Sequence, residues 1–210
     1  MKERGMIFNG EMTRAILDGR KTQTRRPVRF PVLDKNLGCE LAGNELAGEL
    51  SAGNYLNSAF GRPGDRIWVR ETFCPVDDTQ YGGEKWVDYR ATPKFEASHP
   101  AGWDCAPNDA EALKWRPSIH MPRWASRILL EITNVRVERL NAISQEDAQA
   151  EGMELTGWRP TYSDPDSGGE VMTPYDNFAE LWSSIYGDES WKANGWVLVI
   201  SFKRVEGGAA

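Results

Sequence analysis

Residues 19–26 read GRKTQTRR, and they are the most informative stretch of this chain. They follow a short helical pattern from Glu11 to Asp18, and Gly19 stands where a helix would end. Cations and hydroxyls make up most of the stretch, and Pro27 closes it. A helix end that brings a lysine and a threonine together can support amide or ester chemistry. It can equally be a basic turn, so the rest of the chain must distinguish the two.

The elements around this stretch indicate a mixed fold. Residues 6–8 predict a strand, and Asn9 is expected to cap the helix that begins near Glu11. Residues 22–30 are expected to be extended, because prolines at 27 and 31 exclude a helix there. Further strands are predicted at 66–73, 86–90, 126–140 and 196–202, and further helices at 144–152 and 174–186. Many strands with few short helices favour an α+β fold or a β-rich barrel.

Length and charge limit the function classes. The chain has 210 residues, 40% of them hydrophobic, which suits one sizeable core and predicts a single domain over residues 1–210. The net charge is -6, and an acidic protein does not bind nucleic acid by broad phosphate neutralisation. RNA is therefore a disfavoured partner, whereas a small nucleoside carries no such requirement.

Cysteine usage and hydropathy add further expectations. Cys39, Cys74 and Cys105 are widely spaced and odd in number, and neither His99 nor His120 lies near them in sequence, which disfavours a disulfide framework or a zinc site. We expect no cofactor. The chain has no apolar run of about 18 residues, so no membrane span is expected, and its first residues lack the apolar core of a signal peptide. A cytoplasmic location follows as the prediction.

The order of the elements and the pattern Gly19-x-Lys21-x-x-Thr24-x-Arg26 resemble the ASCH domain, a family of PUA-like β-barrels. The family motif is Gly-x-Lys-x-x-Glu-x-Arg, so Thr24 replaces its usual Glu. This replacement is similar to the subgroup that hydrolyses N4-acetylcytidine, whose catalytic set is a Lys, a Thr three residues later and a downstream Glu. The resemblance implies an α+β, PUA-like barrel with short flanking helices and long loop insertions.

The resemblance covers roughly residues 5–30, 60–73 and 126–202, and it implies that Lys21, Thr24 and Glu151 are catalytic. Glu151 is mapped within the segment 146–153, where Glu146 and Glu154 are close in sequence. This chain is longer than the minimal enzyme and looks more like members of the family from bacteriophages and prophages. Its extra material reshapes the expected pocket and lies at about residues 32–59, 75–125 and 156–173.

Amide hydrolysis needs a nucleophile, a group that manages its proton and a site for the oxyanion. Thr24 can supply the hydroxyl. Either a neutral Lys21 accepts its proton while Glu151 orients the base or the leaving amine, or a charged Lys21 stabilises the oxyanion while Glu151 is the base. Positions 21 and 24 face opposite sides of a regular strand. For both to reach one substrate, residues 19–24 must turn or bulge, which Gly19 would allow.

Further candidates for substrate binding carry ordinary structural interpretations as well. Arg26 can pair with a carboxylate, Asn9 can simply cap its helix, and a buried tryptophan can be a core residue rather than a platform for a pyrimidine ring. The complete set of these binding candidates is Arg26, Asn9, Arg70, Glu71, Trp68, Trp115 and His120.

The function that follows is a metal-independent amidohydrolase that removes the N4-acyl group from N4-acetylcytidine or a related N4-acylated cytosine or cytidine. Its partner is a nucleoside or nucleobase substrate, and the oligomeric state is left open. One alternative is a PUA-like module that binds RNA or a modified nucleotide without catalysis. A second is a ribonuclease with an acid–base pair such as Lys21 and His120, and a third is a phage protein with a vestigial site.

Overall fold

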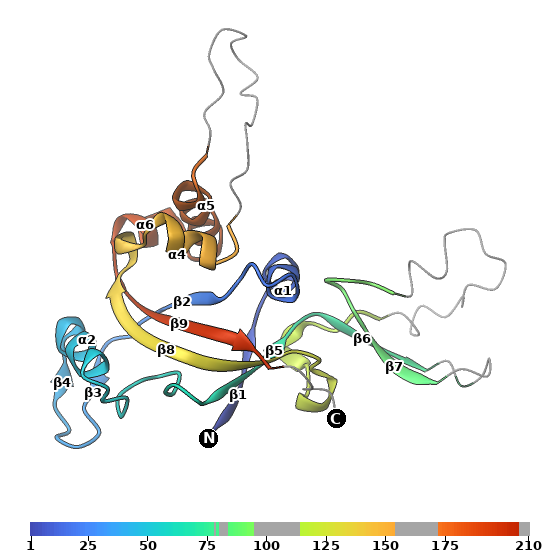
Figure 1. Ribbon diagram of the computed structural model, residues 1–210, viewed down its shortest axis with the longest axis horizontal. Helices are drawn as coiled ribbons and strands as arrows, with labels where there is room; N and C mark the ends of the chain where they lie inside the picture. The colour runs from blue at the N-terminus through green and yellow to red at the C-terminus, as the bar shows by residue number, and fades with distance from the viewer. Residues whose placement is uncertain (78, 80–83, 95–113, 154–171, 206–210) are drawn as a thin grey trace, which may run out of the picture. The chain divides into compact units, whose positions relative to one another are not determined.

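A computed structural model describes residues 1–77, 79, 84–94, 114–153 and 172–205. Its main feature is a mixed sheet of five strands in the order β1-β5-β8-β9-β2 (Figure 1). The α+β class is therefore confirmed. Among the described residues this strand order has two ends, and no closed barrel is found. The bounds of the five strands are Glu3–Ile7 for β1, Arg66–Arg70 for β5, Leu129–Arg139 for β8, Trp196–Arg204 for β9 and Gln23–Pro27 for β2.

The chain divides into two compact units, which are described separately below. The first unit contains residues 1–18, 66–130 and 204–210, and the second contains residues 19–65 and 131–203. Both units are built from segments far apart in sequence. The expected organisation as one domain remains a prediction.

In the first unit, β1 pairs with β5 in parallel, with Gly5 opposite Trp68. Helix α1 spans Gly10–Leu17, and the Asn9 side chain accepts a hydrogen bond of 2.8 Å from the backbone N–H of Met12. The expected N-cap is thus confirmed. Strands β6 (Phe73–Asp77) and β7 (Lys85–Tyr89) form an antiparallel pair. Two short 3-10 helices follow at Ser118–His120 and Arg123–Ala125.

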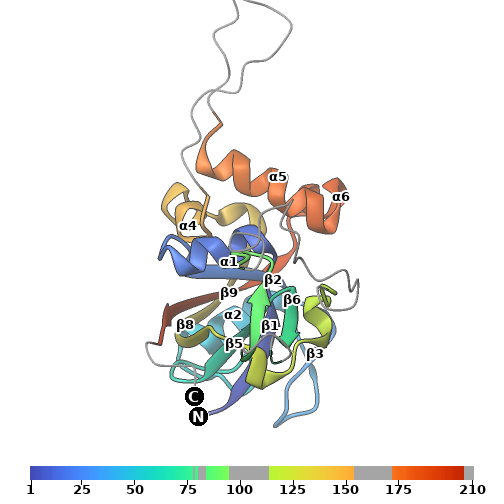
Figure 2. The same cartoon turned by 90° about the vertical axis from the view of Figure 1, so that its right-hand side faces the viewer.

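In the second unit, β2 pairs with β9 antiparallel, with Arg25 opposite Val199. Three helices lie on the same side of these strands (Figure 2): α4 (Gln145–Ala150), α5 (Pro174–Tyr186) and α6 (Asp188–Lys192). Alternate residues of β9 pack against this helical layer because successive strand side chains point to opposite faces. The core between them consists of Leu140, Ile143, Ala148, Phe178, Trp182, Val197 and Val199.

The insertion expected at 32–59 contains regular secondary structure, so the prediction of a loop there is wrong. Strands β3 (Val32–Leu33) and β4 (Glu40–Leu41) form an antiparallel pair, and α2 spans Gly43–Ser51. The helix was not predicted because it contains glycines at 43 and 48, and glycine is a weak helix former. Its apolar positions Leu46 and Leu50 are nevertheless buried, which stabilises it by packing.

Other expected elements agree with the structure to within a few residues, with two exceptions. The strand predicted over 66–73 ends at Arg70, and β6 begins at Phe73. Helix α6 was not expected from the sequence. Most of the expected insertion at 156–173 and part of the one at 75–125 lie outside the described residues, as do His99 and Cys105. Cys39 is an exposed thiol and Cys74 a buried one. Within the described ranges, every helix is too short or too polar to cross a membrane.

Candidate functional site

Lys21 lies in a short extended segment that joins α1 to β2. Gly19 adopts a left-handed φ of +77°, which terminates the helix as expected. The backbone N–H of Thr22 then donates to the carbonyl of Ala150 at 2.8 Å, while the carbonyl of Thr22 accepts from Phe202 at 2.8 Å. Residues 21–22 are therefore held between β9 and the C-terminal end of α4.

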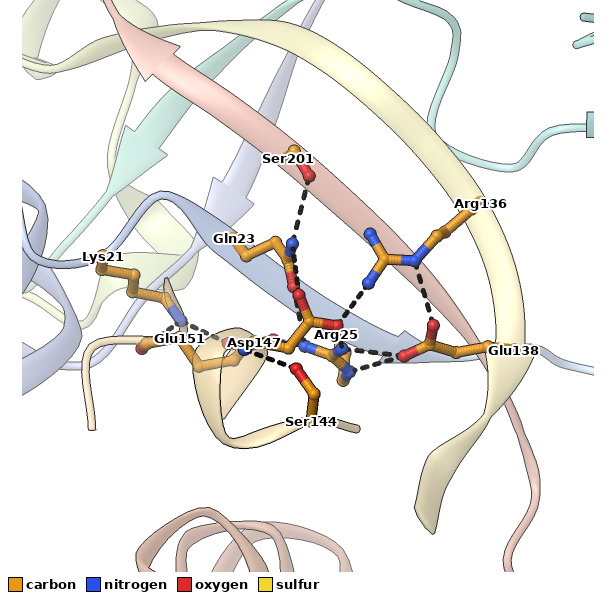
Figure 3. A network of polar contacts seen from close by, with 9 residues as sticks. All are labelled: Lys21, Gln23, Arg25, Arg136, Glu138, Ser144, Asp147, Glu151 and Ser201. Atoms are coloured by element: carbon orange, nitrogen blue, oxygen red, sulfur yellow. Dashed lines mark hydrogen bonds and ion pairs between the residues drawn. The ribbon is translucent and has the colours of Figure 1, made fainter. Parts of the chain in front are cut away.

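Lys21 and Glu151 form a buried ion pair at this position (Figure 3). The Nζ of Lys21 lies 2.5 Å from Oε2 of Glu151 and 2.8 Å from the backbone carbonyl oxygen of the same residue. The Lys21 side chain is 0% exposed and that of Glu151 is 3% exposed. The assignment of Glu151 from the sequence thus identified the carboxylate that contacts Lys21.

Helix α4 positions this carboxylate. Ser144 is its N-cap, and the Ser144 hydroxyl oxygen accepts a hydrogen bond of 3.1 Å from the backbone N–H of Asp147. Glu151 is the C-cap, and Gly152 follows with a φ of +93°. Because Asp147 and Glu151 are one helical turn apart, their side chains share a face. That face contacts β2.

Arg25 is the centre of the network around Glu151. Its side chain is fully buried, and each of the five N–H bonds of a guanidinium has an acceptor here. The Nη1 atom of Arg25 donates to Glu151 Oε1 at 3.2 Å and to Gln23 Oε1 at 2.9 Å. Nη2 donates to Asp147 Oδ2 at 2.8 Å and to Glu138 Oε1 at 2.7 Å, and Nε also donates to Glu138. Arg25 therefore has no donor left for a substrate.

The remaining members of the network complete its charge balance. Arg136 donates to Asp147 Oδ2 at 2.5 Å and to Glu138 Oε2 at 3.0 Å. The Gln23 amide donates to Asp147 Oδ1 at 3.1 Å and to the Ser201 hydroxyl at 3.3 Å. Three carboxylates, those of Glu138, Asp147 and Glu151, face three cations, those of Lys21, Arg25 and Arg136.

Burial lowers the pKa of Lys21 below its ordinary value of 10.5. The charge of Glu151 and its hydrogen bond to Lys21 oppose this effect, and the positive charges of Arg26 and Arg25 add to it. A lysine whose pKa is lowered reaches its neutral form more easily, and only the neutral form can accept a proton. The direction of this shift suits the assignment of Lys21 as the base.

Thr24 and Arg26 lie on β2, and Thr24 is buried. Lys21 and Arg25 contact the same carboxylate, that of Glu151, so both reach the α4 face of the strand. Strand alternation places the side chains of Thr24 and Arg26 on the other face. The structure therefore brings Lys21 and Glu151 together, with Thr24 turned away from the pair, as the odd spacing of positions 21 and 24 indicated.

The other binding candidates all lie in the first unit, and five of the six have structural contacts there. Asn9 caps α1. The Arg70 guanidinium donates to the carbonyl oxygens of Ser118 and Ile119, and it stacks over the Trp68 ring at 5.4 Å from the centroid. One face of the Trp68 ring is therefore occupied.

Glu71 is 2% exposed and forms a two-point ion pair with Arg127, with both distances at 3.0 Å. Burial raises the pKa of the Glu71 carboxyl, and Arg127 opposes that rise. The Arg90 guanidinium lies over the Trp115 ring, 5.2 Å from its centroid. His120 is an exposed residue at the end of a 3-10 helix. The contacts of Glu71 and Trp115 are of an ordinary structural kind.

Sequence reasoning missed four charged members of the network: Arg25, Arg136, Glu138 and Asp147. Two signals were available. Arg136 and Glu138 alternate with Val135 and Val137, as polar residues do when one face of a strand meets polar partners. Asp147 and Glu151 also have the spacing of a shared helix face.

Comparison with models of known protein families, with curated proteins and with solved structures finds no match. In the part of the chain that the structure describes, no three His, Cys, Asp or Glu side chains gather as a metal-ligand set would.

Proposed function

We propose that the chain hydrolyses the exocyclic amide of N4-acetylcytidine or a related N4-acylated cytosine or cytidine, and that it belongs to the PUA-like ASCH family that its motif resembles. The buried Lys21–Glu151 pair is the observation that supports this proposal most strongly. It joins the lysine of the motif to the carboxylate that the resemblance assigned. The proposed reaction breaks the C–N4 bond, adds the oxygen of water to the acyl carbon and releases cytidine and a carboxylate.

In this proposal Lys21 moves the proton. Neutral Lys21 accepts a proton from the attacking hydroxyl and returns it to N4 as the amine leaves. Burial favours the neutral form by lowering the pKa of Lys21. Both oxygens of Glu151 are bound by cations, Oε2 by Lys21 and Oε1 by Arg25, which makes Glu151 a poor base. Its role is then to orient Lys21.

Thr24 is proposed as the source of the attacking hydroxyl, and Arg26 as the cation that stabilises the oxyanion. Loss of the amine leaves the acyl group as an ester on Thr24, and water then hydrolyses this ester to release the carboxylate and restore the hydroxyl. This assignment requires residues 19–24, which include the start of β2, to rearrange when substrate binds, because Thr24 faces away from the pair and the Lys21 side chain is enclosed. Gly19, with its left-handed φ of +77°, adjoins the residues that would move, and the backbone hydrogen bonds of Thr22 to Ala150 and Phe202 would have to break.

A module without catalysis is the second candidate, and the enclosure of Lys21 favours it. With 0% exposure, the Lys21 side chain has the environment of a structural ion pair. Such a module would bind a nucleotide or modified base without turning it over.

A panel of N4-acylated cytosines and cytidines separates the two candidates. Purified protein is incubated with each compound, and release of the free base or nucleoside is followed by chromatography together with release of the acid. Equimolar release of both products supports the amidohydrolase. Binding of the same compounds by calorimetry without any release supports the module without catalysis.

A further inference from the structure

Arg25 and Lys21 hold the two oxygens of one carboxylate. Arg25 Nη1 donates to Glu151 Oε1 at 3.2 Å, and Lys21 Nζ donates to Glu151 Oε2 at 2.5 Å. The negative charge of Glu151 is therefore shared between two buried cations, which compete for it. Arg25 occupies an unspecified position of the family motif that the chain resembles, between Thr24 and Arg26, so that motif assigns it no role.

The position of Arg25 is fixed from several sides. Glu138 on β8, Asp147 on α4 and Gln23 on β2 accept its other N–H bonds, and the Phe178 ring on α5 lies 5.8 Å from its guanidinium carbon. A planar fork of five donors matches this set of acceptors, whereas an ammonium would not. Arg25 therefore cannot move away from Glu151 without breaking contacts to three other elements.

We infer that Arg25 is a positioning residue that orients Glu151 toward Lys21 and, by sharing the carboxylate, keeps Lys21 available as a base. The inference rests on the proposed function for its catalytic meaning, although its electrostatic part concerns the folded protein alone. The charged groups that act on Lys21 are Glu151 from the end of α4 and Arg25 and Arg26 from β2. Removing Arg25 takes away one positive charge and leaves Glu151 to Lys21 alone, and both changes stabilise charged Lys21.

Arg136 provides a matched control. It contacts two of the three carboxylates that Arg25 contacts, those of Asp147 and Glu138, and it carries the same charge. Its hydrogen bonds do not include Glu151 among the described contacts. Arg136→Gln therefore removes a cation from the network without releasing Glu151, while Arg25→Gln does both.

The test is a titration of the Lys21 side chain by NMR in ¹⁵N-lysine-labelled protein, with Lys21→Met used to assign the signal. Arg25→Gln is expected to raise the pKa of Lys21 by about 1 or more, the size of effect that a neighbouring charge produces. Arg136→Gln is expected to raise it by much less. An unchanged pKa in Arg25→Gln, or equal shifts in the two variants, would overturn the inference.

Arg25→Lys covers the case in which Arg25→Gln does not fold. It keeps the charge but cannot hold Glu138, Asp147 and Glu151 together, so the pKa of Lys21 is expected to rise by a smaller amount, and no rise would overturn the inference. Because the titration needs no substrate, it tests this inference even if the amidohydrolase proposal fails. If the protein is active, kcat/KM is expected to increase at a higher pH in Arg25→Gln than in wild type. If Arg25 had only a structural role, Arg25→Gln would lower kcat/KM without changing the pH at which it increases.

Discussion

The Nζ of Lys21 lies 2.5 Å from Oε2 of Glu151, although 130 residues separate the two in sequence. Both side chains are buried, and one backbone bridge joins the same two residues. Burial of an ion pair costs solvation free energy that close contact and further hydrogen bonds must offset. The Lys21 contact to the Glu151 carbonyl and the Arg25 contact to its second oxygen supply such bonds.

Glu151→Gln is expected to lower the free energy of unfolding by about 3–5 kcal/mol, because it leaves the buried Lys21 ammonium without its carboxylate. Lys21→Met is expected to lower it by less, because Arg25 still pairs with Glu151. The double variant is expected to be more stable than the sum of the two losses predicts. Urea unfolding of all four proteins measures this. Strict additivity would show that the pair does not interact in solution.

Thr24→Val is expected to reduce turnover at least about 100-fold if Thr24 supplies the attacking hydroxyl, whereas Thr24→Ser retains a hydroxyl and most of the activity. Val has nearly the size of Thr and Ser lacks only its methyl group, so the unfolding curves of the two variants serve as the control for folding. Full activity in Thr24→Val would remove the nucleophile assignment and leave water as the attacking group.

A lowered lysine pKa predicts a definite pH dependence of stability. Between the folded pKa of Lys21 and its ordinary value of 10.5, the unfolded chain binds more protons than the folded one. The contribution of Lys21 to the free energy of unfolding therefore rises with pH across this window and is least favourable below it. Wild type and Lys21→Met are compared by urea unfolding at several pH values. A difference between them that stays constant, or moves against wild type as pH rises, would contradict the lowered pKa.

Glu71→Gln is expected to destabilise the protein by about 3 kcal/mol, because it leaves the Arg127 guanidinium without its two-point partner. Thermal unfolding measures the loss. Lys85→Met breaks an exposed ion pair with Asp77 and is the control, since exposed pairs contribute little. Equal effects from the two variants would contradict the structural role given to Glu71.

Local signals explain why much of the fold was predictable. Asn9, Ser144 and Gly19 mark helix ends through side-chain capping or a left-handed φ, and these signals depend only on nearby residues. Strands β8 and β9 and helix α5 carry clear apolar periodicity. Helix α2 was missed because its stability comes from the burial of Leu46 and Leu50, which glycine-rich sequence does not reveal.

The site was predictable only in part. The motif identified Lys21, and its resemblance to a known subgroup led to Glu151. In the sequence, however, Arg25 and Arg136 look like ordinary strand residues. Their role depends on which strand faces α4, which is a tertiary relationship. The alternation of positions 21, 23 and 25 then determines which side chains reach Asp147 and Glu151.

The most direct test of the central claim is kcat/KM for N4-acetylcytidine in wild type, Lys21→Met and Lys192→Met. Lys192 is exposed and pairs with Glu189 within α6, so its substitution controls for the loss of a lysine. The account predicts turnover by wild type and Lys192→Met, with a loss of at least about 100-fold in Lys21→Met, the usual contribution of a proton-transfer group. Undiminished turnover by a folded Lys21→Met protein would contradict it.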